Sequence, residues 1–353
     1  MVGYTPEGRP LYIAKLGSGP ERMWIQGRIH GDEPYGNDAC LEIIKSLLGS
    51  GRRILEEMTF WIIPSYNPDG SEHFWRRNAN RIDLNRNWWR TGGTGYSEPE
   101  SIAFYWAWVE FRPHYAIDIH HQGTYFVEDE DGNDTNQMTA FSIGISVRQE
   151  FLEPWIWDVS RGMAVVGYDA VSKLGFCNPS RYPLVNIHSA VVSSMMLGNP
   201  GPDGHDAGWK TAAMFFENRG GIGNKSRGYI IKQNVVAVHA IIDAIAYGEL
   251  TFVEEERWDE IPDRGGRIRD SDKWPNEWAE LDPRTHPDYD AGTVHDEMTA
   301  VDDAGNESDP AGPGTVTAIT PTIPRTFALY QNVPSTSRCS GRPWNGRHSR
   351  RGS

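Results

Sequence analysis

The chain has 353 residues, of which 38% are hydrophobic and 14 are tryptophan, so it can bury one large core beside a smaller appendage and is not a disordered protein. Its formal net charge of −14 argues against nucleic-acid binding, which depends on basic surfaces that displace counterions. No apolar run approaches about 18 residues, so we expect no membrane-spanning helix.

Short apolar runs alternate with segments of helical periodicity through the first 250 residues. Buried strands are predicted at residues 11–15, 23–29, 58–64, 115–119 and 214–216. Helices are predicted at residues 34–48, 98–111 and 229–247. Helices between short apolar strands predict an α/β fold, with a mixed, mostly parallel twisted sheet that helices cover.

The composition changes near residue 250, which indicates a domain boundary. Residues 251–310 carry 19 acidic and 6 basic side chains, whereas residues 311–353 carry 6 basic side chains and no acidic one. We therefore predict one α/β domain in residues 1–250. Residues 251–353 are predicted to be an acidic linker and an irregular, largely disordered appendage.

Two segments of this appendage resemble parts of known modules. Residues 299–308 are similar to the last strand and turn of a fibronectin type III-like module. Residues 326–334 resemble the start of the C-terminal sorting domains of secreted bacterial proteins. The basic, unpatterned end of the chain and the missing signal-peptide pattern at its start lead us to expect a truncated or frame-shifted form of a secreted protein.

Polar residues follow several predicted strands at the point where each strand ends. His30 and Glu33 come after the run 23–29, and an imidazole and a carboxylate at this spacing can bind one metal ion. Asn67, His120 and Glu217 likewise follow apolar runs. Because functional sites of parallel α/β sheets gather at the carboxyl ends of strands, we expect these side chains to meet at one edge.

A third metal ligand is expected from the segment 118–121. Catalytic zinc takes three protein ligands and keeps one open position, and two His with one Glu is a usual set. The three cysteines are too widely spaced to form a thiolate site. Neighbouring residues on a strand face opposite sides, so spacing alone leaves both His120 and His121 open, and we favour His120. Asp118 could orient the bound imidazole, while Asp32 is expected to be an outer carboxylate or a helix cap.

The most specific pattern lies between residues 67 and 88. It consists of Asn67-Pro68-Asp69-Gly70, then Arg76, then Asp83-Leu84-Asn85-Arg86-Asn87-Trp88. With the earlier His-x-x-Glu, the distant His and the late Phe-Glu-Asn-Arg, this order resembles the zinc carboxypeptidases, the metallopeptidases typified by carboxypeptidases A and B. The resemblance covers about residues 3–248 and implies their fold.

The resemblance also implies a metal and a catalytic base. His30, Glu33 and His120 match the residues that hold one Zn²⁺ ion. Glu217 matches the general base, which takes a proton from water and returns it to the leaving amine. A carboxylate at the end of a buried strand is costly unless it is paired or functional, which agrees with this assignment.

Substrate contacts are implied for the arginines of the same segment. Arg76 matches the arginine that polarises the scissile carbonyl, with adjacent Arg77 as an alternative. Asn85 and Arg86 match the residues that bind the C-terminal carboxylate of the substrate, which a planar guanidinium contacts with two parallel bonds.

The chain departs from the family at the substrate pocket. Residues 191–196 contain no tyrosine where the family carries a mobile one, and Tyr182 is the nearest upstream candidate. The residue that selects the substrate side chain cannot be placed within 198–210, so side-chain specificity stays open.

We therefore predict a zinc metallocarboxypeptidase that removes C-terminal residues from peptides or proteins. The alternatives are a zinc amidohydrolase resembling the succinylglutamate desuccinylases or the bacterial cell-wall peptide amidases, and a metal-free peptide-binding pseudo-peptidase. We expect a secreted monomer with no nucleic-acid or membrane partner.

Overall fold

The computed structural model describes residues 1–49, 53–88, 95–185, 187–219 and 226–268. The described residues, up to residue 268, belong to one compact unit. The second unit, residues 291–353, lies outside the described residues, together with both segments that resemble known modules.

A seven-stranded sheet forms the centre of the first unit, in the order β10-β9-β11-β6-β4-β5-β3. Its strands are β3 (Ala14–Gly17), β4 (Glu21–Gly27), β5 (Met58–Ile63), β6 (Tyr115–Gln122), β9 (Phe141–Gly144), β10 (Pro179–Arg181) and β11 (Ala212–Arg219). Four neighbouring pairs are parallel, and β11·β9 and β3·β5 are antiparallel. The predicted mixed, mostly parallel α/β sheet is confirmed.

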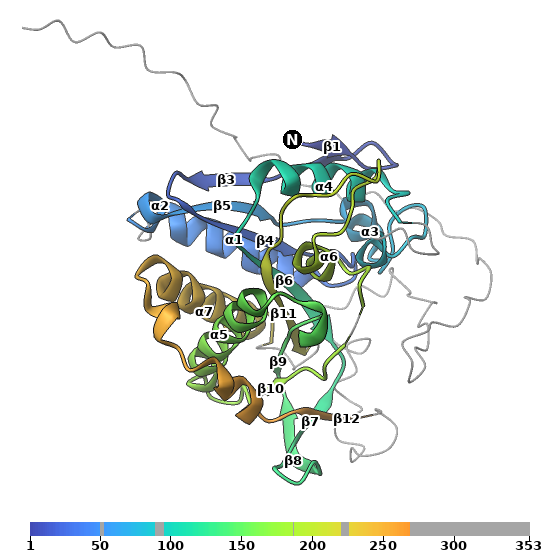
Figure 1. The fold of residues 1–353 in the computed structure, drawn as a ribbon. Helices are drawn as coiled ribbons and strands as arrows, with labels where there is room; N and C mark the ends of the chain where they lie inside the picture. The colour runs from blue at the N-terminus through green and yellow to red at the C-terminus, as the bar shows by residue number, and fades with distance from the viewer. Residues whose placement is uncertain (50–52, 89–94, 186, 220–225, 269–353) are drawn as a thin grey trace, which may run out of the picture. The chain divides into compact units, whose positions relative to one another are not determined.

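Helices cover both faces of this sheet (Figure 1). They are α1 (Pro34–Leu48), α2 (Ile54–Glu57), α3 (Pro68–His73), α4 (Pro99–Phe111), α5 (Pro154–Ser172), α6 (Val191–Leu197) and α7 (Ser226–Ala246). Proline stands at the first helical position of α1, α3, α4 and α5, where its missing N–H is not needed. The sequence predicted α1, α4 and α7 but not α5 or α6.

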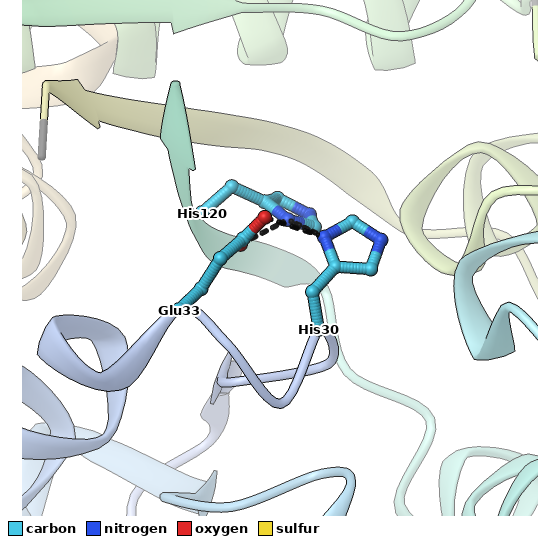
Figure 2. A group of neighbouring side chains, drawn as sticks. All are labelled: His30, Glu33 and His120. Carbon is cyan, nitrogen blue, oxygen red and sulfur yellow. Dashed lines mark hydrogen bonds and ion pairs between the residues drawn. The ribbon is translucent and has the colours of Figure 1, made fainter. Parts of the chain in front are cut away.

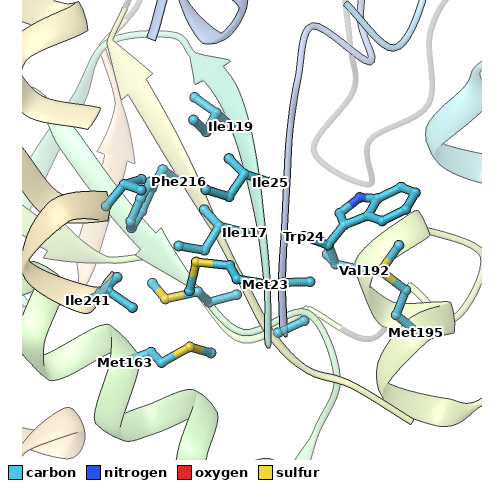
Figure 3. Close-up of a cluster of buried hydrophobic side chains, with 14 of the residues drawn as sticks. Met23, Trp24, Ile25, Ile117, Ile119, Met163, Val192, Met195, Phe216 and Ile241 are labelled. Atoms are coloured by element: carbon cyan, nitrogen blue, oxygen red, sulfur yellow. The ribbon is translucent and has the colours of Figure 1, made fainter. Parts of the chain in front are cut away.

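The core lies on both sides of the central strands. Figure 3 shows Met23 and Ile25 of β4 on the same side as Ile241 of α7, whereas Trp24 faces Met195 of α6. All five side chains are fully buried, and each such burial stabilises the fold by about 1.5–3 kcal/mol. Burial on both faces explains why the buried parts of β4 and β5, residues 23–25 and 60–63, are continuous apolar runs rather than alternating ones.

Two small sheets flank the central one. The strands β1 (Gly3–Tyr4) and β2 (Pro10–Leu11) form a two-stranded ribbon, so the predicted strand 11–15 is divided between β2 and β3. The strands β7 (Tyr125–Glu128), β8 (Asp134–Thr139) and β12 (Arg264–Arg267) form an antiparallel sheet next to the end of β6.

The chain beyond residue 250 continues this packing as far as residue 268. The 3₁₀ turns η3 (Glu249–Phe252) and η4 (Glu255–Glu260) lead into β12, which pairs with β7. Arg257 of η4 forms an ion pair with Asp169 of α5 at 2.8 Å. Residues 269–353 lie outside the described residues, so the division of the chain at residue 250 stays a prediction.

One helix has the length and composition of a membrane span. It comprises residues 227–246 of α7, with a mean hydropathy of 1.3, and half of this window is buried inside the domain. Because α7 packs against α1 and α5, its apolar side chains belong to the core in this fold.

Candidate metal centre and active site

The loop after β4 is held against α3 by two glycines. A Cβ atom on Gly31 would lie 2.0 Å from the carbonyl carbon of Gly70, so this approach requires glycine. The side chain of Asn67 caps α3 by accepting a hydrogen bond from the Gly70 N–H at 2.9 Å. Gly31 N–H also donates to the carbonyl of Arg76 at 3.3 Å. The glycines of both motifs thus bring the His30 loop and the Arg76 loop together.

His30, Glu33 and His120 converge at the edge of the sheet (Figure 2). Glu33 Oε1 lies 2.7 Å from His30 Nδ1, and Glu33 Oε2 lies 3.1 Å from His120 Nδ1. The two Nδ1 atoms are 3.3 Å apart. Glu33 is the N-cap residue of α1, but its carboxylate does not cap the helix and turns to the histidines instead. Asp32 therefore precedes the cap, and it does not fill the capping position considered for it.

The neighbouring histidine is turned away from this cluster. His121 Nε2 accepts the backbone N–H of Tyr35 at 3.2 Å, and the two rings stack at 4.7 Å. Of the two histidines that spacing left open, the structure brings His120 to His30 and Glu33.

The donor set fits a zinc ion. The Nε2 atom of His120 faces Asp118 at 2.9 Å, and that of His30 faces Asp83 at 3.4 Å. The Asp118 carboxylate fixes the proton of His120 on Nε2, and the charge of Asp83 favours the same tautomer of His30. Both Nδ1 atoms then face each other and Glu33. Such a convergence of acceptors is stable with a cation between them, and two His with one Glu suits zinc.

The pKa values of the buried groups reflect the same attraction for positive charge. Burial raises the pKa of Glu33, but the His30 and His120 rings more than offset this and hold it well below its usual range. Burial lowers the pKa of His120, but Asp118 and Glu33 more than offset this and hold it well above its usual range. The pocket is therefore strongly cation-attracting.

Arg76 lies beside the metal-ligand cluster, and its guanidinium is fixed by Asp83. The Arg76 Nη2 atom donates to Asp83 Oδ2 at 3.1 Å, while Nη1 lies 3.8 Å from Glu33 Oε1. Arg77, the alternative, is exposed. The structure thus places Arg76 where it can contact a group bound at the cluster.

Asn85 and Arg86 lie in the 3₁₀ turn η1 (Leu84–Arg86), which the Asp83 side chain caps. Asn85 is buried: its Nδ2 lies 3.4 Å from His120 Nε2, and its Oδ1 accepts the Val191 N–H at 3.0 Å. Arg86 is exposed, and its Nη1 donates to the carbonyl of Asn85 at 2.7 Å. Arg86 therefore offers an exposed guanidinium, whereas Asn85 links the turn to α6.

Glu217 stands opposite His120 in the parallel register of β11 and β6. Among the described residues, its Oε2 atom is buried without a hydrogen-bond partner. Burial is the main cause that raises the pKa of Glu217 to about 7, and the Glu33 carboxylate raises it further. A carboxyl group that titrates near neutral pH can both accept and return a proton.

Sequence reasoning missed residues that the fold brings to the same edge. Tyr182, named only as the nearest tyrosine, packs against Phe215 with ring centroids 5.0 Å apart. Arg264 of β12 lies over the rings of Tyr125 and Tyr182. No sequence signal indicated Arg264, because its strand forms only by pairing with β7.

A His–Glu–His cluster at the strand ends of an α/β sheet, with a partly buried glutamate opposite, can bind a zinc ion beside a carboxylate. Residues 1–123 match the family of zinc carboxypeptidases. The predicted resemblance is thereby confirmed over residues 1–123. Zinc is the cofactor of that family, and the match includes both loops and His120 but ends before Glu217.

Curated relatives are similar over short stretches. Carboxypeptidase 2 of Trichophyton tonsurans is 32% identical over 111 residues, which cover 31% of this chain and 20% of the relative. Human carboxypeptidase A6 is 32% identical over 110 residues, or 25% of each chain. The chain thus spans about a fifth to a quarter of the length of these relatives.

Solved structures share the fold over a longer part of the chain. A metallo-carboxypeptidase from Burkholderia cenocepacia aligns with a TM-score of 0.50 and 22% identity, covering 71% of this chain and 64% of that one. A metallo-carboxypeptidase from Pseudomonas aeruginosa, in complex with (2-guanidinoethylmercapto)succinic acid, aligns with a TM-score of 0.51 and 16% identity over the same shares. These likenesses establish the fold.

Proposed function

We propose that the protein is a zinc-dependent metallocarboxypeptidase that hydrolyses the C-terminal peptide bond of peptides or proteins. The observation that carries this proposal is the convergence of His30, Glu33 and His120 within 4.8 Å of one another, with Glu217 opposite on β11. The match of residues 1–123 to the zinc carboxypeptidases supports it.

In this proposal His30, Glu33 and His120 hold one Zn²⁺ ion, and Asp83 and Asp118 orient the two imidazoles. When bound, zinc supplies Lewis-acid charge that acidifies water and stabilises negative charge on oxygen. Because Asp118 and Asp83 face the Nε2 atoms, the Nδ1 atoms are the ones directed at the ion.

The remaining steps belong to the side chains around the metal ligands. Glu217 accepts a proton from the attacking water and gives it to the leaving amine, for which a pKa near 7 is suited. Arg76, fixed by Asp83, donates hydrogen bonds to the scissile carbonyl as it gains negative charge. Arg86 binds the terminal carboxylate of the substrate, with Asn85 beside it.

The proposal also includes secretion, a monomeric state and the absence of a membrane partner. The half-buried helix α7 supports the last point, since its apolar face is used inside the domain. Cell fractionation and light scattering would test these parts.

Metal content and peptide hydrolysis together test the function. We expect purified protein to contain about one zinc ion by mass spectrometry and to release C-terminal residues from N-blocked dipeptides. The same dipeptides with a C-terminal amide should be resistant, and chelation should abolish release. Hydrolysis that ignores the terminal carboxylate would favour an amidohydrolase, and absence of both zinc and turnover would favour a pseudo-peptidase.

A further inference from the structure

Arg264 occupies an unusual position next to the proposed active site. Its guanidinium carbon lies 3.9 Å from the ring centroid of Tyr125 and 3.8 Å from that of Tyr182. Its Nη1 donates to Gln122 Oε1 at 2.8 Å. Two aromatic rings and one amide thus fix the plane of the guanidinium, so a ligand can reach it along its edge.

A line of contacting rings connects this guanidinium to the metal ligands. The ring centroid of Tyr182 lies 5.0 Å from that of Phe215, which lies 6.4 Å from the ring of His120. Phe215 and Glu217 are two residues apart on β11 and therefore face the same side of the sheet. We call Tyr125, Tyr182, Phe215 and Arg264 the aromatic wall, and it borders the site on the Glu217 side.

Among the residues that the structure describes, Arg264 has no carboxylate partner. Within the described ranges, no acidic side chain lies within ion-pair distance of it, and its Nε atom is buried without a hydrogen-bond acceptor. Two nearby arginines do form ion pairs: Arg257 with Asp169, and Arg181 with Asp263. A partly buried guanidinium with no carboxylate partner among the described residues is free to bind an anionic ligand.

The positive charge of Arg264 is felt at Glu217. It is among the groups that lower the pKa of Glu217, although burial prevails and keeps that pKa raised. Arg264 lies against Tyr182, which contacts Phe215 two residues before Glu217, so the guanidinium borders the Glu217 side of the proposed site.

We propose that Arg264 determines substrate specificity by binding the side-chain carboxylate of an acidic residue at the C-terminus of the substrate. This inference rests on the proposed function, in which Arg86 already binds the terminal carboxylate from a different loop. A planar guanidinium held between rings presents its edge to a carboxylate, which it can bind with two parallel hydrogen bonds. The protein then selects peptides that end in Asp or Glu.

Paired dipeptides that differ only in charge test this inference. N-acetyl-Phe-Glu and N-acetyl-Phe-Gln are nearly equal in size, so the ratio of their kcat/KM values isolates the carboxylate. With zinc-loaded protein we expect a Glu/Gln ratio of about ten or more, because hydrogen bonds between charged groups contribute at that level. Arg264→Gln should reduce the ratio to about one, and Arg264→Glu should make N-acetyl-Phe-Lys the preferred substrate.

A control and a second readout keep the result independent of folding and of turnover. Arg257→Gln removes the same charge from the same segment and should leave the ratio unchanged, since Arg257 pairs with Asp169 on α5. Arg264→Lys keeps the charge without the planar edge and should retain part of the preference. Calorimetric titration of the same dipeptides into the zinc-loaded Glu217→Gln protein measures binding without hydrolysis. The ratio of the Glu and Gln dipeptide affinities should depend on Arg264 in the same way.

The outcomes separate this inference from the proposed function. A Glu/Gln ratio that survives in Arg264→Gln, or an equal loss of Glu and Gln binding, would overturn the role of Arg264 in side-chain recognition while peptidase activity stands. Arg264-dependent binding without any zinc-dependent hydrolysis would support the acidic subsite and refute the peptidase.

Discussion

Asp118 is the residue whose replacement tests the metal centre most cleanly. It is fully buried, and its Oδ2 atom accepts a hydrogen bond from His120 Nε2 at 2.9 Å. Asp118→Asn preserves volume but removes the charge that fixes the imidazole with Nδ1 free for the metal. The change therefore alters the metal site without opening a cavity.

Replacing a carboxylate that hydrogen-bonds a metal-binding histidine typically weakens metal affinity by about 10- to 100-fold, which is roughly 1.4–2.7 kcal/mol. At a fixed concentration of free zinc, the stabilisation that zinc gives to the folded protein should fall by the same amount. For a domain of this size that corresponds to a loss of roughly 3–10 °C in the zinc-induced rise of Tm.

The assay is thermal unfolding with and without zinc, combined with competition against a chelator. Asp169→Asn is the matched control, because Asp169 forms an exposed ion pair with Arg257 far along α5. Equal zinc affinity in Asp118→Asn and wild-type protein would refute the reasoning that Asp118 orients a metal ligand.

Three further predictions address the remaining side chains. His120→Ala should abolish stoichiometric zinc binding measured by mass spectrometry. His121→Ala should retain it, since His121 packs on Tyr35 away from the cluster. The reverse result would show that His121, and not His120, is the metal ligand. Arg76→Gln should lower kcat by about 100- to 1,000-fold with zinc content unchanged, and a mere rise in KM would argue against carbonyl polarisation. Burial raises the pKa of Glu217 to about 7 from a usual 4.5. Between these two pH values the native state keeps a proton that the unfolded state has released. Stability of the zinc-free protein should then fall as pH rises from about 4.5 to 7, by roughly 3 kcal/mol at most, and this loss should be absent in Glu217→Gln. Burial also raises the pKa of Glu100 to about 7, but that contribution is common to both proteins and cancels in the comparison of their urea unfolding curves.

The strands that the sequence predicted are those buried on both faces. Mostly apolar runs such as 23–29 and 58–64 indicate strands even before their pairing partners are known, because a parallel sheet covered by helices has no polar face. Their ends were predicted for the same reason: His30 and Glu217 stand where an apolar run stops. The structure brings these residues together at one sheet edge, as the parallel topology requires.

The choice between His120 and His121 shows where sequence reasoning stopped. Both residues lie within β6, and alternation tells only that they face opposite sides. The side that carries the metal ligands is fixed by the register of β6 between β4 and β11, which aligns His120 with Glu217. Register depends on tertiary pairing that no local pattern contains.

Helix α6 and strand β12 escaped prediction because neither has a pattern of its own. The seven residues of α6 are almost all buried, and Ser193 and Ser194 find hydrogen-bond partners inside the domain, so no periodicity appears. The sequence of β12 is Arg-Gly-Gly-Arg, and its extended form comes from pairing with β7.

The position of β12 bears on how the active site is built. Strand β7 follows β6 within three residues of Gln122, so any segment that pairs with β7 is placed beside the carboxyl ends of β6 and β11. The pairing of β12 with β7 therefore positions Arg264 beside the site, and no local sequence motif indicates that position. Because β12 lies beyond residues 1–123, which match the family, the metal ligands and the aromatic wall come from different parts of the chain. Substitutions in the C-terminal segment can then change substrate preference while His30, Glu33 and His120 stay constant. The metal ligands contact the aromatic wall through the rings of Phe215 and Tyr182.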